Sequence, residues 1–190
     1  VVALTDQAPS YAAKPDDPGT AYTPLSVSSP VSRDVVGRAL ESLSDAGLDL
    51  LVASLHWGPN WTTGPDRRRR RLAHWLVDRG VDVVHGHSAH VFHGVEVYRD
   101  RPILYDCGDF VDDYVVKPEL RNDRSWLFEL VVEDGAFRSV DLVPVHIDDS
   151  AVHPADSATA AWLRETVRDR SEPFETEFER SGDGLAVPLE

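Results

Sequence analysis

Residues 48–87 read LDLLVASLHWGPNWTTGPDRRRRRLAHWLVDRGVDVVHGH, and this stretch decides the fold. Leu48 to Leu55 is a nearly continuous apolar run, which is typical of a strand buried on both faces. Apolar residues then recur at helical spacing until Gly80, and Val81 to Val84 forms a second short apolar run. Strand, helix and strand within about 35 residues predict a βαβ unit with parallel strands and a right-handed crossover. The carboxyl ends of the two strands are therefore expected side by side.

The chain before this unit supplies one more strand and one helix. Val1 to Thr5 is predicted to be a strand, and residues 6–30, rich in Pro, Asp, Ser and Gly, a long loop. Val35 to Leu43 carries apolar residues at helical spacing, and Gly47 provides a stop signal. This part extends the α/β pattern toward the amino terminus.

Beyond the unit the periodicity changes to that of antiparallel hairpins. Val95 to Tyr98 and Ile103 to Tyr105 flank a short polar turn. Leu127 to Val132 and Phe137 to Val145 flank Asp134-Gly135, a strong hairpin signal. The sequence therefore predicts mixed sheets, with a parallel βαβ unit followed by antiparallel hairpins.

The last part of the chain is predicted to add a helix and a closing segment. Asp156 can cap a helix that runs through Arg170, and Phe174 to Leu189 closes the chain. No internal repeat or second boundary is visible, so residues 1–190 are interpreted as one α/β domain.

Composition excludes several classes of protein. The 190 residues are 42% hydrophobic and include five Trp, which is enough for a core and argues against disorder. A formal charge of −14 makes nucleic acid a poor partner, and no apolar run approaches the ~20 residues of a membrane-spanning helix. Cys107 is the single cysteine, so an intrachain disulfide is excluded, and it is interpreted as a structural thiol.

Lysine is scarce among the basic residues. Only Lys14 and Lys117 are lysines, and Asp outnumbers Glu two to one. An acidic, lysine-poor surface suits a halophile, because it stays soluble where salt screens charge. A GC-rich genome explains the same composition equally well, so both interpretations stay open.

Histidines gather where the two strands of the βαβ unit end. His56 lies at the end of the first strand, and His85, His87 and His90 lie at the end of the second. Open α/β sheets bind ligands at this edge. The set continues after a later strand with Asp106 and Asp109. Imidazole and carboxylate together suit Zn²⁺, Mn²⁺ or Fe.

A single histidine is more often an ordinary surface or core residue, but three coinciding at one sheet edge favour a metal site. We therefore predict His56, His87 and His90 as metal ligands. His85 lies inside the strand and can instead point into the core. His93 can support a ligand by donating to a carboxylate such as Glu96, or be an exposed polar residue. The supporting group is thus expected to include His85, His93, Glu96, Asp106 and Asp109.

Two further features have simpler interpretations beside functional ones. Arg67 to Arg71 could suggest nucleic acid, but a solvated helix face paired with the many carboxylates is favoured. Trp57 and Trp61 could stack on a sugar or polymer, although core packing is the safer interpretation.

Three linked motifs resemble one known family. They are Leu55-His56-Trp57-Gly58, the segment Val81 to Val91 (VDVVHGHSAHV), and Gly94 to Tyr98 with Arg101 to Phe110 (RPILYDCGDF). Together they resemble the CapA family of capsule synthesis, the poly-γ-glutamate branch of the calcineurin-like metallophosphatases. The resemblance covers nearly the whole chain, up to the tail around Phe174-Glu175-Thr176.

The resemblance implies a metallophosphatase-like βαβ sandwich with a dinuclear metal site. It places His56 at the family's strand-end ligand, and His87 and His90 at the paired histidines of its G-H-H-P-H form. Ser88 and Ala89 replace the central His-Pro of that form, and the family's Ser-Leu-Gly-Asn-Phe is Asp106 to Phe110 here. It implies divalent ions (Mn, Zn or Fe), an anionic polymer or phosphoester substrate, and an association with the cell envelope, although a cytoplasmic location stays open.

The family's amino-terminal ligand motifs do not occur in this sequence. Family members begin with a G-D strand end, an N-L-E type segment and an N-N-H segment, and Val1 to Thr5 resembles the strand after them. The resemblance therefore predicts the carboxyl-terminal half of the domain, whose site is completed by a missing segment or a partner chain. A noncatalytic subunit that binds or scaffolds the polymer is the alternative function.

Overall fold

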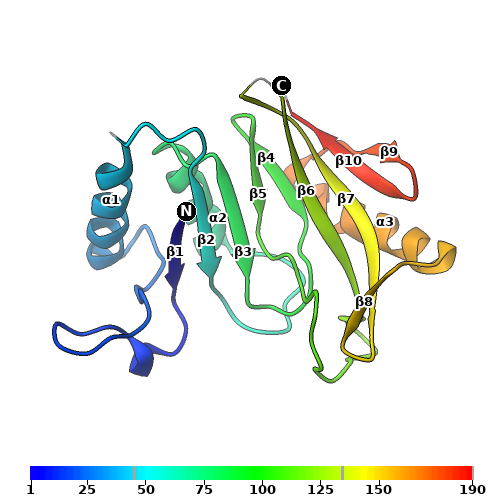
Figure 1. The fold of residues 1–190 in the computed structure, drawn as a ribbon, viewed down its shortest axis with the longest axis horizontal. Coiled ribbons are helices and arrows are strands. Elements are labelled where there is room, and N and C mark those ends of the chain that lie inside the picture. Colours follow the sequence, from blue (N-terminus) through cyan, green and yellow to red (C-terminus); the bar gives the residue numbers. More distant parts are fainter. Residues whose placement is uncertain (45, 134, 190) are drawn as a thin grey trace.

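The computed structural model describes residues 1–44, 46–133 and 135–189. Its first sheet is mixed and has the strand order β1-β2-β3-β5-β4 (Figure 1). Within the sheet, β1, β2, β3 and β5 are parallel, and β4 is antiparallel to β5. The predicted βαβ unit and first hairpin are confirmed. The strands are β1 (Val2–Thr5), β2 (Val52–His56), β3 (Val83–His87), β4 (Val95–Tyr98) and β5 (Arg101–Leu104).

The second sheet is antiparallel, as the hairpin pattern predicts. Its order is β6-β7-β10-β9, and β8 pairs with the far end of β7. The turn residue Asp134 of the predicted hairpin lies outside the described residues, but the strands on either side pair over ten positions. The strands are β6 (Arg124–Glu133), β7 (Ala136–Asp148), β8 (Ala151–Pro154), β9 (Glu179–Ser181) and β10 (Gly184–Pro188).

Three α-helices lie against these sheets in the described part of the chain. Figure 1 shows α2 behind the first sheet and α3 behind the second. An aspartate caps each of these two helices: Asp66 accepts a hydrogen bond from the Arg69 amide, and Asp156 accepts one from the Thr159 amide at 2.7 Å. The cap predicted at Asp156 is confirmed. The helices are α1 (Pro30–Ser44), α2 (Arg67–Val77) and α3 (Ser157–Ser171), with short 3₁₀ turns η1 (Pro9–Tyr11) and η2 (Glu172–Phe174).

Two apolar clusters form the core. The first fills the space between α1, α2 and one face of the first sheet, with Leu55, Leu72 and Val84 fully buried. The second joins α3 and the second sheet to the other face of β3, β4 and β5, around Leu163 and Leu142. The first sheet is therefore covered by helices on one face and only partly covered on the other.

The structure corrects the bounds and burial of the two strands predicted from residues 48–87. β2 begins at Val52, because Leu48 and Leu50 are 47% and 37% exposed, and β3 begins at Val83 and extends to His87. Burial alternates along β2 instead of being continuous, since the face that carries Ser54 and His56 is not covered by helices. The strands are thus apolar on the helix-covered face and polar near their carboxyl ends on the other.

Candidate metal site

Three imidazoles form a row at the carboxyl ends of β2 and β3, here called the imidazole row (His56, His85 and His87). The parallel register pairs His56 with His87 and Ser54 with His85, so all four side chains lie on one face of the sheet. The ring centroids of His56 and His87 are 5.1 Å apart, and those of His85 and His87 are 5.3 Å apart. The expected meeting of the two strand ends is therefore observed.

The surroundings of the two β3 histidines disfavour their charged forms. The pKa of His87 is lowered to about 4, chiefly by burial and next by the neighbouring His85 and His56. Burial also lowers the pKa of His85, whose Nδ1 lies 3.2 Å from the Ser54 hydroxyl. The Nδ1 atom of His87 is buried without a hydrogen-bond partner. A neutral ring with an unused nitrogen is the form in which histidine binds metal.

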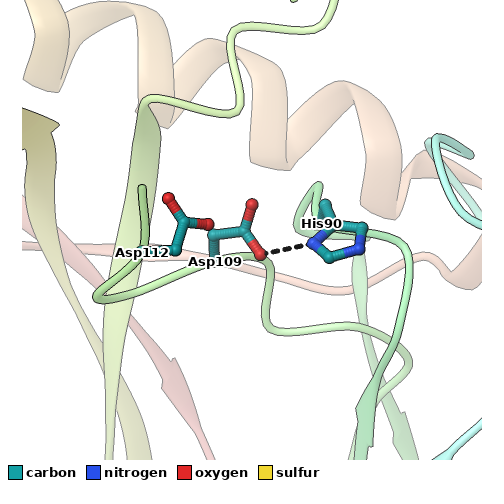
Figure 2. A group of neighbouring side chains, drawn as sticks. All are labelled: His90, Asp109 and Asp112. Carbon is teal, nitrogen blue, oxygen red and sulfur yellow. Dashed lines mark hydrogen bonds and ion pairs between the residues drawn. The ribbon is translucent and has the colours of Figure 1, made fainter. Parts of the chain in front are cut away.

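His90 belongs to a second group, here called the His–Asp cluster (His90, Asp109 and Asp112). Its ligand atoms lie within 4.8 Å of one another, and Figure 2 shows Asp109 between His90 and Asp112. His90 Nδ1 is 2.8 Å from Asp109 Oδ1. Within the described parts of the chain this is the one set of three histidine, cysteine or carboxylate side chains so placed. His90 thus groups with two aspartates, and a metal-binding role for His56, His87 and His90 together stays a prediction.

The carboxylates of the His–Asp cluster are crowded. The pKa of Asp109 is raised to about 7, chiefly by burial and next by the adjacent Asp112 carboxyl, while His90 opposes the rise. Asp109 Oδ2 and Asp112 Oδ2 are buried, and no described group outside the cluster donates a hydrogen bond to either atom. Trp61 stacks on His90 with ring centroids 4.9 Å apart, and Tyr114 packs on it at 4.6 Å. The cluster therefore concentrates negative charge against an imidazole fixed between two aromatic rings.

Asp106 fastens together the two loops that form the cluster. Its buried carboxylate accepts hydrogen bonds from the Ala89 amide at 2.7 Å and the Gly108 amide at 2.9 Å. Burial raises the pKa of Asp106 to about 6, and these two hydrogen bonds act in the opposite direction. Because Ala89 precedes His90 and Gly108 precedes Asp109, Asp106 positions two members of the cluster without belonging to it.

The other predicted supporting residues have different partners from those expected. His93 is buried, and its Nε2 lies 3.0 Å from the Thr62 carbonyl oxygen, so it does not donate to Glu96. Burial lowers the pKa of His93 to about 4, against the effect of the Thr62 hydrogen bond. Glu96 is buried between Arg70 and His74, each 2.9 Å away, and accepts a hydrogen bond from the Tyr105 hydroxyl. Glu96 therefore supports the core beside α2, and not His93 or the imidazole row.

The arginine run and Trp57 follow the simpler interpretations, whereas Trp61 is partly exposed and packs on His90. Arg68, Arg69 and Arg70 pair with Asp6, Asp66 and Glu96 in turn. Trp57 is buried and donates to the Tyr105 carbonyl oxygen.

Cys107 also fits a structural role. Its side chain packs against the second core cluster, and burial raises the pKa of its thiol. A thiol that stays protonated is not an activated nucleophile.

Sequence reasoning missed Asp112. The available signal was its position three residues after Asp109, in the segment that follows β5 at the same sheet edge.

None of the described helices is long and apolar enough to cross a membrane.

Comparison with known proteins settles the family. Residues 1–114 match the family described as bacterial capsule synthesis protein PGA_cap. The chain belongs to this family. It is 36% identical over 172 residues to a probable polyglutamine synthesis accessory protein of Mycobacterium tuberculosis (strain H37Rv), an alignment covering 87% of this chain and 44% of the relative. The resemblance to CapA proteins seen in the sequence is thereby confirmed.

Two Bacillus proteins show the same relation over shorter stretches. The chain is 34% identical over 110 residues to capsule biosynthesis protein CapA of Bacillus anthracis, covering 58% of this chain and 26% of that protein. It is 27% identical over 132 residues to PGA biosynthesis protein CapA of Bacillus subtilis (strain 168), covering 68% and 34%. This PGA_cap chain thus spans less than half the length of each of these relatives.

Proposed function

We propose that this PGA_cap chain takes part in the biosynthesis of a poly-γ-glutamate-type anionic polymer, and that His56, His87 and His90 hold divalent metal for phosphoesterase-like hydrolysis. The observation that carries the proposal is the imidazole row at the carboxyl edge of parallel strands. The names of the Mycobacterium and Bacillus relatives support the polymer class.

The residues present fit a divalent ion. His87 is uncharged above pH 4 and has an unused buried nitrogen, and His56 lies beside it on the next strand. Imidazole suits Zn²⁺, Mn²⁺ and Fe²⁺. A divalent ion bound here supplies a water of lowered pKa and polarises a phosphoryl oxygen. The Ser54 hydroxyl orients His85, and the Trp57 indole ties the end of β2 to the Tyr105 carbonyl oxygen.

Phosphodiester hydrolysis with added metal tests this proposal. The chain is assayed with Mn²⁺ or Zn²⁺ against a chromogenic phosphodiester, alongside His87→Ala and the control His153→Ala, whose side chain is exposed. We expect turnover above the metal-only background, absent in His87→Ala and unchanged in His153→Ala. The rate is expected to be low, because neutral imidazoles do not offset the charge of two divalent ions. Equal turnover by wild type and His87→Ala would overturn the proposal.

A noncatalytic role in polymer binding is the second candidate, and one observation favours it. A hollow of about 580 Å³ lies between the start of α2 and the end of α3, lined by Arg67, Arg70 and Arg170 among others. Guanidinium groups bind carboxylates through paired hydrogen bonds. Retention of a polyglutamate by the wild type but not by Arg67→Ala, without any metal-dependent turnover, would favour this second function over the first.

A further inference from the structure

The His–Asp cluster has the donor set of a cation site. It offers one imidazole and two carboxylates, drawn from the loop after β3 and the segment after β5, with ligand atoms within 4.8 Å of one another. Of the three residues of this cluster, the resemblance to the CapA family carries over only His90 as a ligand. It assigns no role to Asp112, and Asp109 stands where the family has Asn.

One oxygen of each aspartate has no hydrogen-bond donor from outside the cluster in the described part of the chain. These atoms, Asp109 Oδ2 and Asp112 Oδ2, are both shielded from solvent, while Asp112 Oδ1 accepts a hydrogen bond from the Tyr114 amide. The Asp109 side chain is only 12% exposed, and its other oxygen already contacts His90. Unsatisfied buried carboxylate oxygens are costly, and a cation satisfies them together. The cluster therefore has ligand capacity that the protein itself leaves unused.

The cluster is also held in place by groups outside it. Asp106 bonds to the Ala89 and Gly108 amides, and an isolated bridge joins Phe92 to Cys107 across the same two loops. Trp61 and Tyr114 limit the position of the His90 ring. Such preorganisation is what a metal site requires of its surroundings.

Asp112 is one of the residues that line an acidic hollow. The hollow measures about 220 Å³ and its lining includes five aspartates: Asp112, Asp113, Asp123, Asp148 and Asp149. A concave surface lined by one sign of charge raises the local concentration of counter-ions. The surface beside Asp112 therefore attracts cations.

We propose that His90, Asp109 and Asp112 bind one divalent transition-metal cation, with both aspartates as direct ligands. Mixed imidazole and carboxylate donors favour Mn²⁺ or Zn²⁺ over Ca²⁺ or Cu⁺. This inference goes beyond the proposed function, since the cluster binds its cation whether or not the chain hydrolyses a phosphoester.

Calorimetric titration with Mn²⁺ at pH 7.5 and 0.15 M KCl tests the proposal. The variants are Asp109→Asn and Asp112→Asn, and the matched control is Asp113→Asn, which removes the same charge from the same hollow. We expect a loss of affinity of about tenfold or more in the first two variants and under about threefold in the control. Equal affinities in all proteins, or an equal loss in Asp113→Asn, would overturn direct ligation.

Thermal unfolding in EDTA provides a second readout. If Asp112 only stabilised the fold, its replacement would lower the melting temperature, whereas a ligand role predicts a rise. Without metal the two carboxylates repel each other, so Asp112→Asn should raise the melting temperature in EDTA. The rise in melting temperature that Mn²⁺ causes in the wild type should be absent in this variant. A fall in melting temperature in EDTA together with an intact Mn²⁺-induced rise would contradict the proposal. His87→Ala separates it from the proposed function, because this variant is expected to lose turnover yet keep the Mn²⁺ bound by the cluster.

Discussion

The imidazole row and the His–Asp cluster lie at the same carboxyl edge of the first sheet, yet they are built differently. The row projects from two regular parallel strands, and the strand register sets its spacing. The cluster lies on irregular loops in which Ser88, His90 and Gly108 have positive φ angles of 144°, 61° and 73°. The pKa values of His85 and His87 in the row are lowered, whereas the cluster brings two carboxylates together and the pKa of Asp109 is raised. The main-chain hydrogen bonds between β2 and β3 are thus enough to place the imidazoles of the row. The carboxylates of the cluster depend instead on side-chain hydrogen bonds and on strained backbone.

The largest effect is expected from a change that breaks the strand register of the row. Gly86 lies between His85 and His87, and a Cβ atom there would overlap the Tyr105 carbonyl oxygen and lie 2.6 Å from Trp57 Nε1. Gly86→Ala should lower the free energy of unfolding by about 3 kcal/mol or more, because neither group can move freely. Gly64→Ala is the matched control, since nothing lies within 4 Å of its Cβ position. Denaturant unfolding measures both, and similar stabilities would refute this packing argument.

A somewhat smaller effect concerns the loop after β3, which His93 connects to the Thr62 carbonyl oxygen. The pKa of His93 is about 4 in the folded protein and 6.5 in the unfolded chain. The unfolded chain therefore binds more protons between these two pH values. The contribution of His93 to the free energy of unfolding is present above pH 6.5. It is lost as the pH falls to 4, by an amount on the order of 2–3 kcal/mol.

Comparison with variants isolates this contribution, because Asp106 and Asp109 have raised pKa values and act in the opposite direction. Unfolding free energies measured from pH 7 to 4 should fall less steeply in His93→Gln than in the wild type. Exposed His153→Ala should leave the slope unchanged. Parallel curves for wild type and His93→Gln would contradict the assignment.

The smallest of the three effects should separate the cluster from the row. Asp106→Asn at pH 7.5 removes one acceptor for the Ala89 and Gly108 amides and should cost about 1–2 kcal/mol. Since these bonds position His90 and Asp109, Mn²⁺ affinity should fall as well. The nuclear magnetic resonance shifts of the His56 and His87 rings, which the strand ladder holds, should change little. Large shifts in those rings would show that the row and the cluster are one unit.

The same difference explains what the sequence could predict. The register of parallel strands follows from the apolar runs and the crossover helix, so the neighbourhood of His56 and His87 was predictable. Asp109 was also expected at this edge, but Asp112 and the separation of His90 from the row were not predictable, because they depend on positive φ angles at non-glycine residues and on the Asp106 bonds. The pairing of Glu96 with His74 was likewise missed, since it joins β4 to α2 through side chains alone.

Diffraction from crystals grown with Mn²⁺, recorded at the Mn absorption edge, tests most directly whether this edge of the sheet binds metal. The structure predicts an anomalous peak bounded by His90, Asp109 and Asp112, and a second peak at His56 and His87. It also predicts that Asp112→Asn removes the first peak and leaves the second. Peaks confined to other acidic surface groups, with none at either histidine site under saturating Mn²⁺, would contradict the account.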